Sequence, residues 1–517
     1  MALGRLALLT REGALESRAA YDKLVRSSRE RALLFSCSAL LGWDEQTYLP
    51  RGGAAYRGDQ MALLAGLLHE RATDPALGDL LGAVEGSDLV ADPDSPEHAN
   101  AREWRRSYDR ATKLPRGLVE ELARATSVAV PHWVEARKAS DFAAFGPWLA
   151  SIVELKRQEA ACLAPGADPY DALLDEYEPG AKGADLARLF EALRVELVPL
   201  VAAIAGSTRG PKPGLLEGDY PPDRQKVFGE MVASAVGFDF EAGRLDTAAH
   251  PFCSGIGPGD TRITTRFDPR DFSPAFFGIL HEVGHGLYEQ GLDPAHQGTP
   301  MGEAVSLGVH ESQSRLWENG VGRSLAFWQG WLPQARRVFR EPLHAVGLDA
   351  FHAAINRVEP SLIRVEADEV TYNLHILIRF ELEQALIGGT LAVDDLPDAW
   401  RSKYREYLKI TPPDDAQGCL QDIHWAAGLI GYFPTYTLGN LYAAQLRDRA
   451  DVDLGGLDPA FARGDFAGLL GWLREKVHRQ GQRHRAADLI RRATGQDPDH
   501  RPLVRSLRSK YGEVYGL

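Results

Sequence analysis

Cysteine is scarce in this sequence of 517 residues, and the four that are present lie far apart. Cys37, Cys162, Cys253 and Cys419 form no C-x-x-C pair, so neither a disulfide framework nor a thiolate zinc site is indicated. Free, buried thiols in a reducing compartment are the state that this pattern favours. We therefore expect a cytoplasmic protein.

Long apolar runs are missing as well. No stretch reaches the roughly 20 residues that span a bilayer, and residues 1–10 lack the apolar core and cleavage site of a signal peptide. The first 17 residues or so carry no readable signal of their own. We expect no membrane partner.

Basic residues are outnumbered, with 58 Lys and Arg against 72 Asp and Glu and a formal net charge of -14. Binding to nucleic acid requires a basic face, so this balance argues against a nucleic-acid partner. A hydrophobic content of 44% and a charged content of 25% are ordinary for a globular protein. The acidity does not exclude a negatively charged substrate, because one positive pocket can lie inside an acidic shell.

The apolar pattern predicts a predominantly α-helical fold with a minor β-sheet. Amphipathic helical spacing covers most of the first 240 residues, whereas residues 250–267 are glycine-containing and then β-prone. We predict one catalytic domain over residues 1–517, either undivided or bilobed with a boundary near residue 240. The predicted helices cover residues 17–54 with a break at 50–53, then 61–71, 101–111, 115–139, 142–161, 184–204 and 360–387.

The middle of the chain carries the pattern H-E-x-x-H, from His281 to His285. Residues four apart lie on one face of a helix, so His281 and His285 could present two imidazole nitrogens to one Zn²⁺. Glu282 could then reach a water held by that metal. The competing interpretation is a buried histidine pair that is satisfied by backbone carbonyl groups.

The flanks of this pattern also predict a helix. Ser273 is a candidate N-cap, Pro274 suits the first helical position, and Gly291 is a candidate stop. The two histidines lie on the same stripe as the apolar residues of this segment. We therefore expect them to face inward.

A catalytic zinc site needs a third protein ligand in addition to two histidines. The segment Ser306 to Arg315 follows about 25 residues later and is predicted to be helical, and either His310 or Glu311 could complete the site. Glu311 is preferred, because two neutral histidines and one carboxylate leave the metal with a net charge of +1. That charge preserves Lewis acidity toward a carbonyl and predicts metal-assisted peptide hydrolysis, with Glu282 as general base and then general acid.

Cleavage at a chain end would require a fixed positive group for the terminal carboxylate. Arg364, Asp368, Thr371 and His375 would form a polar stripe on the helix predicted for residues 360–387. A buried Arg364 that receives the substrate carboxylate is one interpretation. An exposed ion pair between Arg364 and Asp368, four residues apart, is the other.

Three residues near position 430 could supply further donors to the reaction. His424, Tyr432 and Tyr436 could stabilise the oxyanion of a tetrahedral intermediate. Packing in the core is the competing role for each of them.

Several sequence blocks, taken in order, resemble the Taq-type thermostable metallocarboxypeptidase family. The similarity extends from about residue 20 to the C-terminus, and six ordered blocks are far more specific than one H-E-x-x-H pattern. The blocks are His250-Pro251-Phe252, residues 260–264, 281–285, 310–314, 363–368 and 418–425.

This resemblance implies a mostly helical, saddle-like fold with a deep groove, similar in plan to the neurolysin-type and angiotensin-converting-type peptidases. It implies the release of single C-terminal residues with broad preference, dependence on Zn²⁺ or Co²⁺, and a homodimer. The resemblance also implies roles for individual residues. His281, His285 and Glu311 would be the metal ligands, Glu282 the general base and Arg364 the residue that binds the substrate carboxylate. Asp260, Arg262 and His250 would act at the substrate end of the groove, and Tyr436, in preference to Tyr432 and with His424 beside it, would stabilise the transition state.

Two alternatives remain at the level of the sequence. A metallo-oligopeptidase or dipeptidyl-carboxypeptidase would use the same metal site with a different position of the carboxylate anchor. A non-catalytic peptide-binding protein is the alternative from another class. Glu282 argues against the latter, because a binding protein has no use for a general base.

Overall fold

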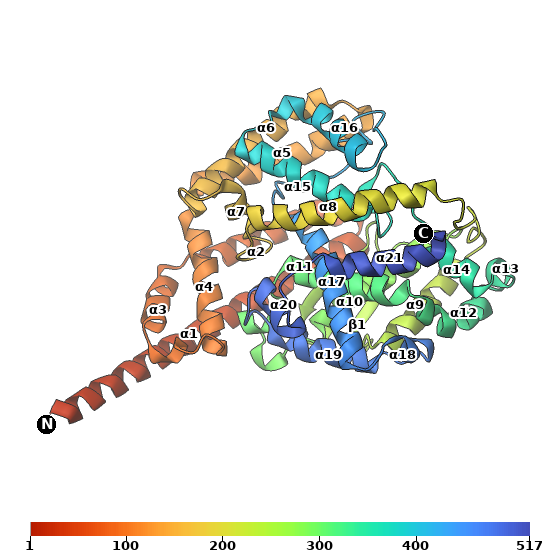
Figure 1. The fold of residues 1–517 in the computed structure, drawn as a ribbon. Helices are drawn as coiled ribbons and strands as arrows, with labels where there is room; N and C mark the ends of the chain where they lie inside the picture. Colours follow the sequence, from red (N-terminus) through yellow and green to blue (C-terminus); the bar gives the residue numbers. More distant parts are fainter. Residues whose placement is uncertain (1) are drawn as a thin grey trace.

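The computed structural model describes residues 2–517, with side chains described from residue 15 onward. The described part excludes Met1 and the side chains of residues 2–14. The prediction about the first 17 residues falls mostly on these positions. Helices dominate, with twenty-one α-helices and one three-stranded sheet in the described part of the chain (Figure 1). The prediction of a predominantly helical fold with a minor sheet is confirmed.

The N-terminal helices form a small core of their own. The first, α1 (Ala2–Thr47), is followed by α2 (Ala54–Ala72), α3 (Pro75–Glu85) and α4 (Pro96–Lys113), and a short 3-10 turn at Arg51–Gly53 separates α1 from α2. Figure 1 shows α1, α3 and α4 side by side at one end of the molecule. The predicted break at residues 50–53 is confirmed, whereas α3 was not predicted.

Five further helices precede the sheet. They begin at strong local signals; for example, the Asp141 carboxylate accepts a hydrogen bond from the Ala144 N–H at the start of α6. The predicted ranges 115–139, 142–161 and 184–204 agree with the structure to within two residues, but α7 and α9 were missed. The five helices are α5 (Arg116–Ala139), α6 (Phe142–Leu163), α7 (Pro169–Leu174), α8 (Gly183–Gly206) and α9 (Pro222–Val236).

The sheet lies directly before the H-E-x-x-H helix and packs against it. Its strands are β1 (Gly243–Thr247), β2 (Cys253–Gly257) and β3 (Asp260–Thr265), in the order β1-β3-β2. The central strand β3 pairs in parallel with β1 and antiparallel with β2. Because β3 contacts α10, the sheet forms one side of the support for the metal-binding motif. The span predicted to form a sheet, residues 250–267, contains β2 and β3, whereas β1 lies outside it.

Three helices after the sheet carry the central motif and its neighbours. They are α10 (Ser273–Glu289), α11 (Leu307–Arg315), which continues into a π-helical turn (Leu316–Gly322), and α17 (Pro434–Asp453). The predicted capping role of Ser273 is wrong, because Phe272 occupies the cap position and the Asp271 carboxylate accepts from the Ser273 N–H at 2.9 Å. The helix ends at Glu289, one residue before the C-cap Gln290, as the position of Gly291 indicates.

The helix predicted for residues 360–387 begins later than the apolar pattern indicates. Residues Arg364–Glu366 form a 3-10 turn, and α15 spans only Tyr372–Gly388. The Asp368 carboxylate accepts from the backbone N–H groups of Val370 and Thr371, both at 2.9 Å, and thereby fixes a turn ahead of the helix. The polar stripe predicted for this segment is therefore wrong, because Arg364 is not on the helix.

The remaining helices complete the body around this centre. They are α12 (Leu325–Val338), α13 (Arg340–Leu343), α14 (Leu348–Ile355), α16 (Leu396–Tyr407), α18 (Asp458–Ala462), α19 (Ala467–Lys476), α20 (Ala486–Thr494) and α21 (Arg501–Tyr515).

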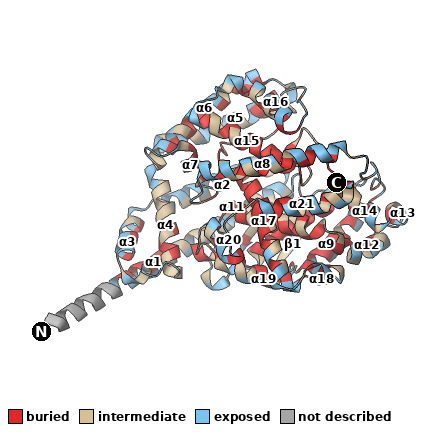
Figure 2. Ribbon diagram, in the orientation of Figure 1, coloured by how far each residue is buried: buried red, intermediate tan, exposed pale blue. Residues whose placement is uncertain are grey.

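Buried residues concentrate around α10, α11 and α17, as Figure 2 shows. The principal hydrophobic core includes residues from Ala129 to Tyr515 and so contains parts of the chain on both sides of residue 240. The division of the chain into domains stays a prediction. The four cysteines are free, but only Cys419 is buried, and Cys37 is exposed. None of the helices in the described residues combines the length and apolar character that crossing a bilayer requires.

Candidate metal centre

Three side chains converge where α10 and α11 meet. The Nε2 atoms of His281 and His285 lie 3.7 and 3.5 Å from the same carboxylate oxygen, Oε2 of Glu311. One ligand atom from each residue lies within 4.8 Å of the other two, and no other group of three potential ligands in the described part of the chain does this. Two imidazole nitrogens and one carboxylate oxygen are a donor set that suits Zn²⁺ or Co²⁺.

Two glycines allow the three helices to approach closely at this point. A Cβ atom on Gly284 of α10 would lie 2.5 Å from the backbone of Gln313 and Ser314 in α11. A Cβ atom on Gly439 of α17 would lie 2.5 Å from Cγ of Glu311. The contact at Gly284 is with main-chain atoms that cannot move aside, so the separation of the two ligand-bearing helices depends on this glycine.

An arginine holds the carboxylate of Glu311 in place. Arg315 lies one helical turn after Glu311 and donates from Nε to Oε1 at 2.7 Å, which leaves Oε2 facing the histidines. Burial raises the pKa of Glu311, but the charges of Arg315 and the two histidines outweigh it and hold the pKa well below its usual value. The Glu311 carboxylate is therefore ionised and oriented.

The two histidines have different partners at their second ring nitrogen. Nδ1 of His281 lies 3.0 Å from Oε2 of Glu318, in the π-helical turn. Nδ1 of His285 lies 2.5 Å from Nδ1 of His310. His310, the alternative third ligand, is thus directed at the back of His285 and is not one of the three converging groups. Both ligand candidates point Nε2 inward.

Burial and charge separate the pKa values of the two histidines. Burial lowers the pKa of His281, but Glu311 and Glu318 outweigh it, so the net shift is upward. For His285, burial dominates and lowers the pKa to about 4. The neutral form of His285, with a lone pair on a ring nitrogen, is therefore favoured at neutral pH.

Glu282 lies beside the three converging side chains without belonging to them. It is buried, and burial raises its pKa to about 7 despite the opposing effect of His281. A carboxylate whose pKa lies near neutrality is suited to accept a proton and release it again. This is the environment that a general base adjacent to a metal requires.

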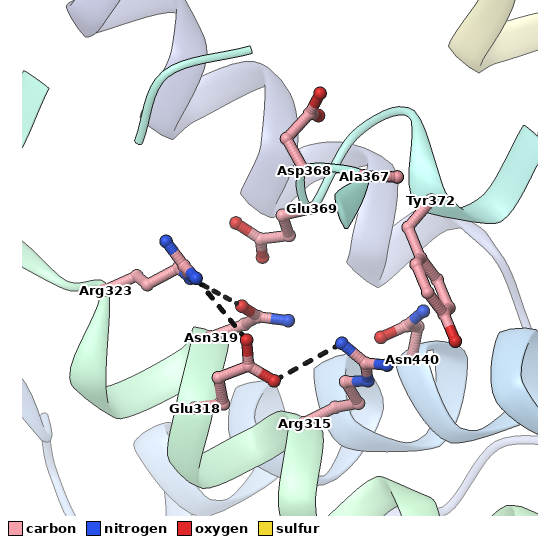
Figure 3. A pocket seen from close by; sticks show the side chains of 9 residues that line it. All are labelled: Arg315, Glu318, Asn319, Arg323, Ala367, Asp368, Glu369, Tyr372 and Asn440. Atoms are coloured by element: carbon pink, nitrogen blue, oxygen red, sulfur yellow. Dashed lines mark hydrogen bonds and ion pairs between the residues drawn. The ribbon is translucent and has the colours of Figure 1, made fainter. Parts of the chain in front are cut away.

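A polar cavity of about 30 Å³ lies behind the metal ligands, next to Arg315 and Glu318 (Figure 3). Arg315 and Arg323 approach the two oxygens of Glu318 from either side, at 3.3 and 3.5 Å. The guanidinium of Arg315 also lies over the ring of Tyr372, at 4.5 Å from its centroid. Glu318 is therefore fixed behind His281 by two cations.

A second buried cluster surrounds Arg364. Its Nε and Nη2 atoms donate to Oδ1 of Asp422 at 2.9 and 2.8 Å, and Nη1 donates to the Tyr372 hydroxyl at 3.1 Å. Arg379, which is fully buried, donates to the other oxygen of Asp422 at 2.7 Å. The partner of Arg364 is thus Asp422, so the alternative interpretation, an exposed ion pair with Asp368, is wrong. The predicted burial of Arg364 is confirmed.

The Arg364 cluster carries excess positive charge. Burial raises the pKa of Asp422, but Arg379 and Arg364 outweigh it, so the pKa lies well below its usual value. One carboxylate therefore faces two arginines. Three of the five N–H groups of Arg364 are used in the bonds above, which leaves one on each terminal nitrogen.

His424 and the two candidate tyrosines lie together beside Arg364. Nε2 of His424 lies 3.2 Å from the Tyr436 hydroxyl, and the rings of Tyr432 and Tyr436 are 5.4 Å apart. The Arg364 guanidinium lies 5.2 Å from the centroid of the Tyr436 ring. Burial and then the charge of Glu311 raise the pKa of Tyr432. The structure therefore brings these three candidates together beside Arg364.

The substrate-end candidates lie elsewhere. Arg262 and Asp260, on β3, form a bidentate ion pair with both contacts at 2.8 Å. The Arg262 guanidinium also lies 4.2 Å from the centroid of the Trp43 ring on α1. His250 is exposed on the connection between β1 and β2. These residues are not among the groups that converge on the metal ligands.

Sequence reasoning missed four residues that support the site. Glu318 lies seven residues after Glu311, a helical spacing that could have indicated a shared face. A charged residue within the apolar helix α15 could have marked Arg379 as a paired, buried cation. The other two are Asp422, quoted only as part of a block, and Glu289, which contacts His310 at 2.8 Å.

Nearly the whole chain is similar in sequence to known proteins, and these proteins are all carboxypeptidases. Residues 23–511 match the model of the family described as carboxypeptidase Taq (M32) metallopeptidase. The chain is 52% identical to thermostable carboxypeptidase 1 of Thermus thermophilus, covering 96% of this chain and 99% of the relative. It is 38% identical to carboxypeptidase 1 of Bacillus subtilis, covering 93% and 95% respectively.

Solved structures agree with these relatives. The crystal structure of the M32 carboxypeptidase from Deinococcus radiodurans superposes with a TM-score of 0.93 at 43% identity, covering 96% of this chain and 100% of that one. Metallocarboxypeptidase 1 of Trypanosoma cruzi superposes with a TM-score of 0.91 at 34% identity, covering 95% and 99%.

Proposed function

Because this chain belongs to the carboxypeptidase Taq (M32) family and is a metallocarboxypeptidase, we propose that it releases single residues from peptide C-termini with broad preference. The observation that carries the proposal is that one side chain, Tyr372, contacts both the surroundings of the metal-ligand candidates and Arg364. Tyr372 lies under Arg315, which holds the ligand Glu311, and its hydroxyl accepts from Arg364. A metal-binding group and an anion-binding group therefore stand on either side of one side chain.

We propose that His281, His285 and Glu311 hold a Zn²⁺ ion, with Co²⁺ as the alternative. The donor set supports this assignment, because both Nε2 atoms face Oε2 of Glu311 while each Nδ1 is occupied by another partner. When bound, such a metal would supply Lewis acidity toward the scissile carbonyl and would activate a water molecule.

The reaction itself would use the side chains around that centre. Glu282 takes a proton from the attacking water and passes it to the leaving amine, and its buried position keeps the carboxylate from being solvated. Tyr436 donates to the developing oxyanion, and His424, 3.2 Å from the Tyr436 hydroxyl, orients it. Tyr432, in contact with Tyr436, is the alternative donor.

The free end of the substrate would be recognised by Arg364. One N–H on each terminal nitrogen remains for a carboxylate, and the excess positive charge of the cluster favours an anion. Asp422 also pairs with Arg379, so its single negative charge is shared between two arginines and does not fully neutralise Arg364. Asp260, Arg262 and His250, which lie apart from the centre, would contact more distant residues of the peptide.

Blocked peptides test this function directly. The purified protein, loaded with Zn²⁺, is incubated with one peptide in free, N-blocked and C-amidated form, and the released amino acids are measured. We expect release from the free and N-blocked peptides and none from the amidated one. Cleavage of the amidated peptide would favour an oligopeptidase, and release of dipeptides would favour a dipeptidyl-carboxypeptidase.

Three further properties belong to the same proposal. The chain forms one catalytic domain, because its principal core includes residues on both sides of position 240. The protein acts in the cytoplasm, where four free cysteines stay reduced. It forms a homodimer, which light scattering of the purified protein would test against a mass of 56.7 kDa for one chain.

A further inference from the structure

Nδ1 of the ligand candidate His285 is 2.5 Å from Nδ1 of His310, on a different helix. Nε2 of His310 is in turn 2.8 Å from Oε1 of Glu289. Glu289 lies four residues after His285 on α10, so both of these partners of His310 lie on the same face of that helix. His310 therefore bridges two residues of the metal-binding helix from α11.

The protons on these rings follow from the contacts. A histidine that binds a metal through Nε2 carries its proton on Nδ1, and that N–H requires an acceptor. The partner of His285 is another imidazole, which accepts only through a nitrogen without a proton. His310 must therefore carry its own proton on Nε2, which is the nitrogen that faces the Glu289 carboxylate.

From this arrangement we infer that His310 is a positioning residue for the metal site. It accepts the N–H of His285 and, through its bond to Glu289, keeps that ligand in one tautomer and one ring orientation. The inference rests on the proposed ligand set and goes beyond it, because it assigns a role to a histidine that does not converge with the ligands.

The position of His310 supports a role in orientation. Its ring lies against that of His285, with centroids 4.6 Å apart, and its centroid is 5.2 Å from that of the Tyr288 ring. The Tyr288 hydroxyl accepts from the Val305 N–H just before α11. Packing of the ring against two residues of α10 leaves His310 little freedom to turn away from His285.

The other ligand candidate has a different kind of support. His281 contacts the carboxylate of Glu318 directly, and two arginines hold that carboxylate. His285 contacts a neutral ring, and the carboxylate stands one step further away. His310 therefore fixes the orientation of the His285 ring but places less negative charge next to it than Glu318 places next to His281. The two histidines are expected to donate electron density to the metal unequally.

Two substitutions of His310 separate the roles of acceptor and of bulk. The carbonyl oxygen of Asn can occupy a position close to that of Nδ1, whereas Phe fills the space without an acceptor. Zn²⁺ affinity is measured by competition with a chromogenic chelator on the full-length protein. We expect His310→Phe to weaken Zn²⁺ binding by roughly 10- to 100-fold, and His310→Asn by no more than roughly threefold.

A spectroscopic measurement reports on the tautomer itself. In the Co²⁺-loaded protein, the N–H protons of both ligand histidines give hyperfine-shifted, exchangeable proton NMR signals. We expect two such signals in the wild type and in His310→Asn. In His310→Phe one of them should broaden through faster exchange with solvent. Thermal unfolding of the metal-free variants checks that each one folds.

The outcomes distinguish this inference from the ligand assignment. If His285→Ala left Zn²⁺ affinity unchanged, the ligand set would be wrong. If His285→Ala abolished binding while His310→Phe stayed within roughly twofold of the wild type, the positioning role alone would be refuted. An equal loss in His310→Phe and His310→Asn would also overturn it, because the acceptor would then have no effect.

Discussion

The surroundings of the metal ligands and the surroundings of Arg364 are built from the same parts but carry opposite excess charge. Beside the ligand candidates lie three carboxylates and two arginines, and these arginines pair with Glu311 and Glu318, whereas around Arg364 two arginines share one carboxylate. The first set is Glu282, Glu311, Glu318, Arg315 and Arg323, and the second is Arg364, Arg379 and Asp422.

Buried ions are costly unless they are paired, so an unbalanced cluster indicates a missing partner. With Glu282 ionised, the first cluster has an unpaired negative charge and suits a cation. The second has an unpaired positive charge and suits an anion. The comparison teaches that the sign of the imbalance, more than the presence of an ion pair, distinguishes a binding site from a structural one.

The largest expected effect comes from removing the unpaired negative charge. Glu282→Gln should lower kcat by roughly 10²- to 10⁴-fold, because the amide cannot accept the proton of the attacking water. Zn²⁺ content should stay at the wild-type value, since Glu282 is not one of the three converging ligands. A variant that retains the metal and also hydrolyses peptides at the wild-type rate would refute the mechanism.

Removing the unpaired positive charge should have the next largest effect. Arg364→Met leaves Asp422 paired with Arg379 and so balances the second cluster. We expect kcat/KM for an N-blocked dipeptide to fall roughly 10- to 100-fold, the equivalent of about 1.5–3 kcal/mol for hydrogen bonds to a charged group. Arg401→Met, which breaks another arginine–aspartate pair, with Asp415, is the matched control and should leave kcat/KM unchanged.

A smaller effect is expected behind the metal ligands. Glu318→Gln should weaken Zn²⁺ binding by roughly tenfold, because the amide oxygen can still accept from His281 but the negative charge is lost. Glu369→Gln is a suitable control, since Glu369 lines the same cavity and pairs with Lys510. Equal losses of Zn²⁺ affinity in both variants would show that the cavity as a whole, and not the contact with His281, sets the affinity.

The smallest expected effect is on stability in acid. Burial, with help from Arg364 and Arg379 against Asp422, lowers the pKa of His424 from 6.5 to about 4. Between these values the unfolded chain binds a proton that the folded protein does not, so the wild type loses stability as the pH falls. Linkage puts the loss at about 2 kcal/mol between pH 8 and pH 5.

His424→Phe removes this titrating group and should be less sensitive to acid. The measurement is urea unfolding of the wild type and the variant at pH 8 and pH 5. The free energy of unfolding of the variant should fall by less over this range than that of the wild type. Parallel pH dependence would contradict a lowered pKa at His424.

The three converging side chains were predictable from the sequence because their meeting depends on local geometry. Helical spacing placed His281 and His285 on one face, and charge arguments selected Glu311 over its neighbour His310. Most helices from residue 115 to 206 were also placed to within two residues. Hydrophobic periodicity depends on the local secondary structure, and these features are set by that local structure.

The support of the site was not predictable in the same way. Arg364 and Asp422 are 58 residues apart in the chain, and Arg379 and Asp422 are 43 apart. No local pattern specifies which buried aspartate meets which buried arginine. The error over residues 360–371 has a related cause, since the apolar pattern continues through a turn that the Asp368 side chain fixes by binding backbone N–H groups.

The glycine at position 284 limits which residue the metal-site helix can carry there. Its contact with the backbone of Gln313 and Ser314 sets the distance between the ligand-bearing helices without any side chain. Even the smallest side chain at position 284 would meet that backbone and force the two helices apart.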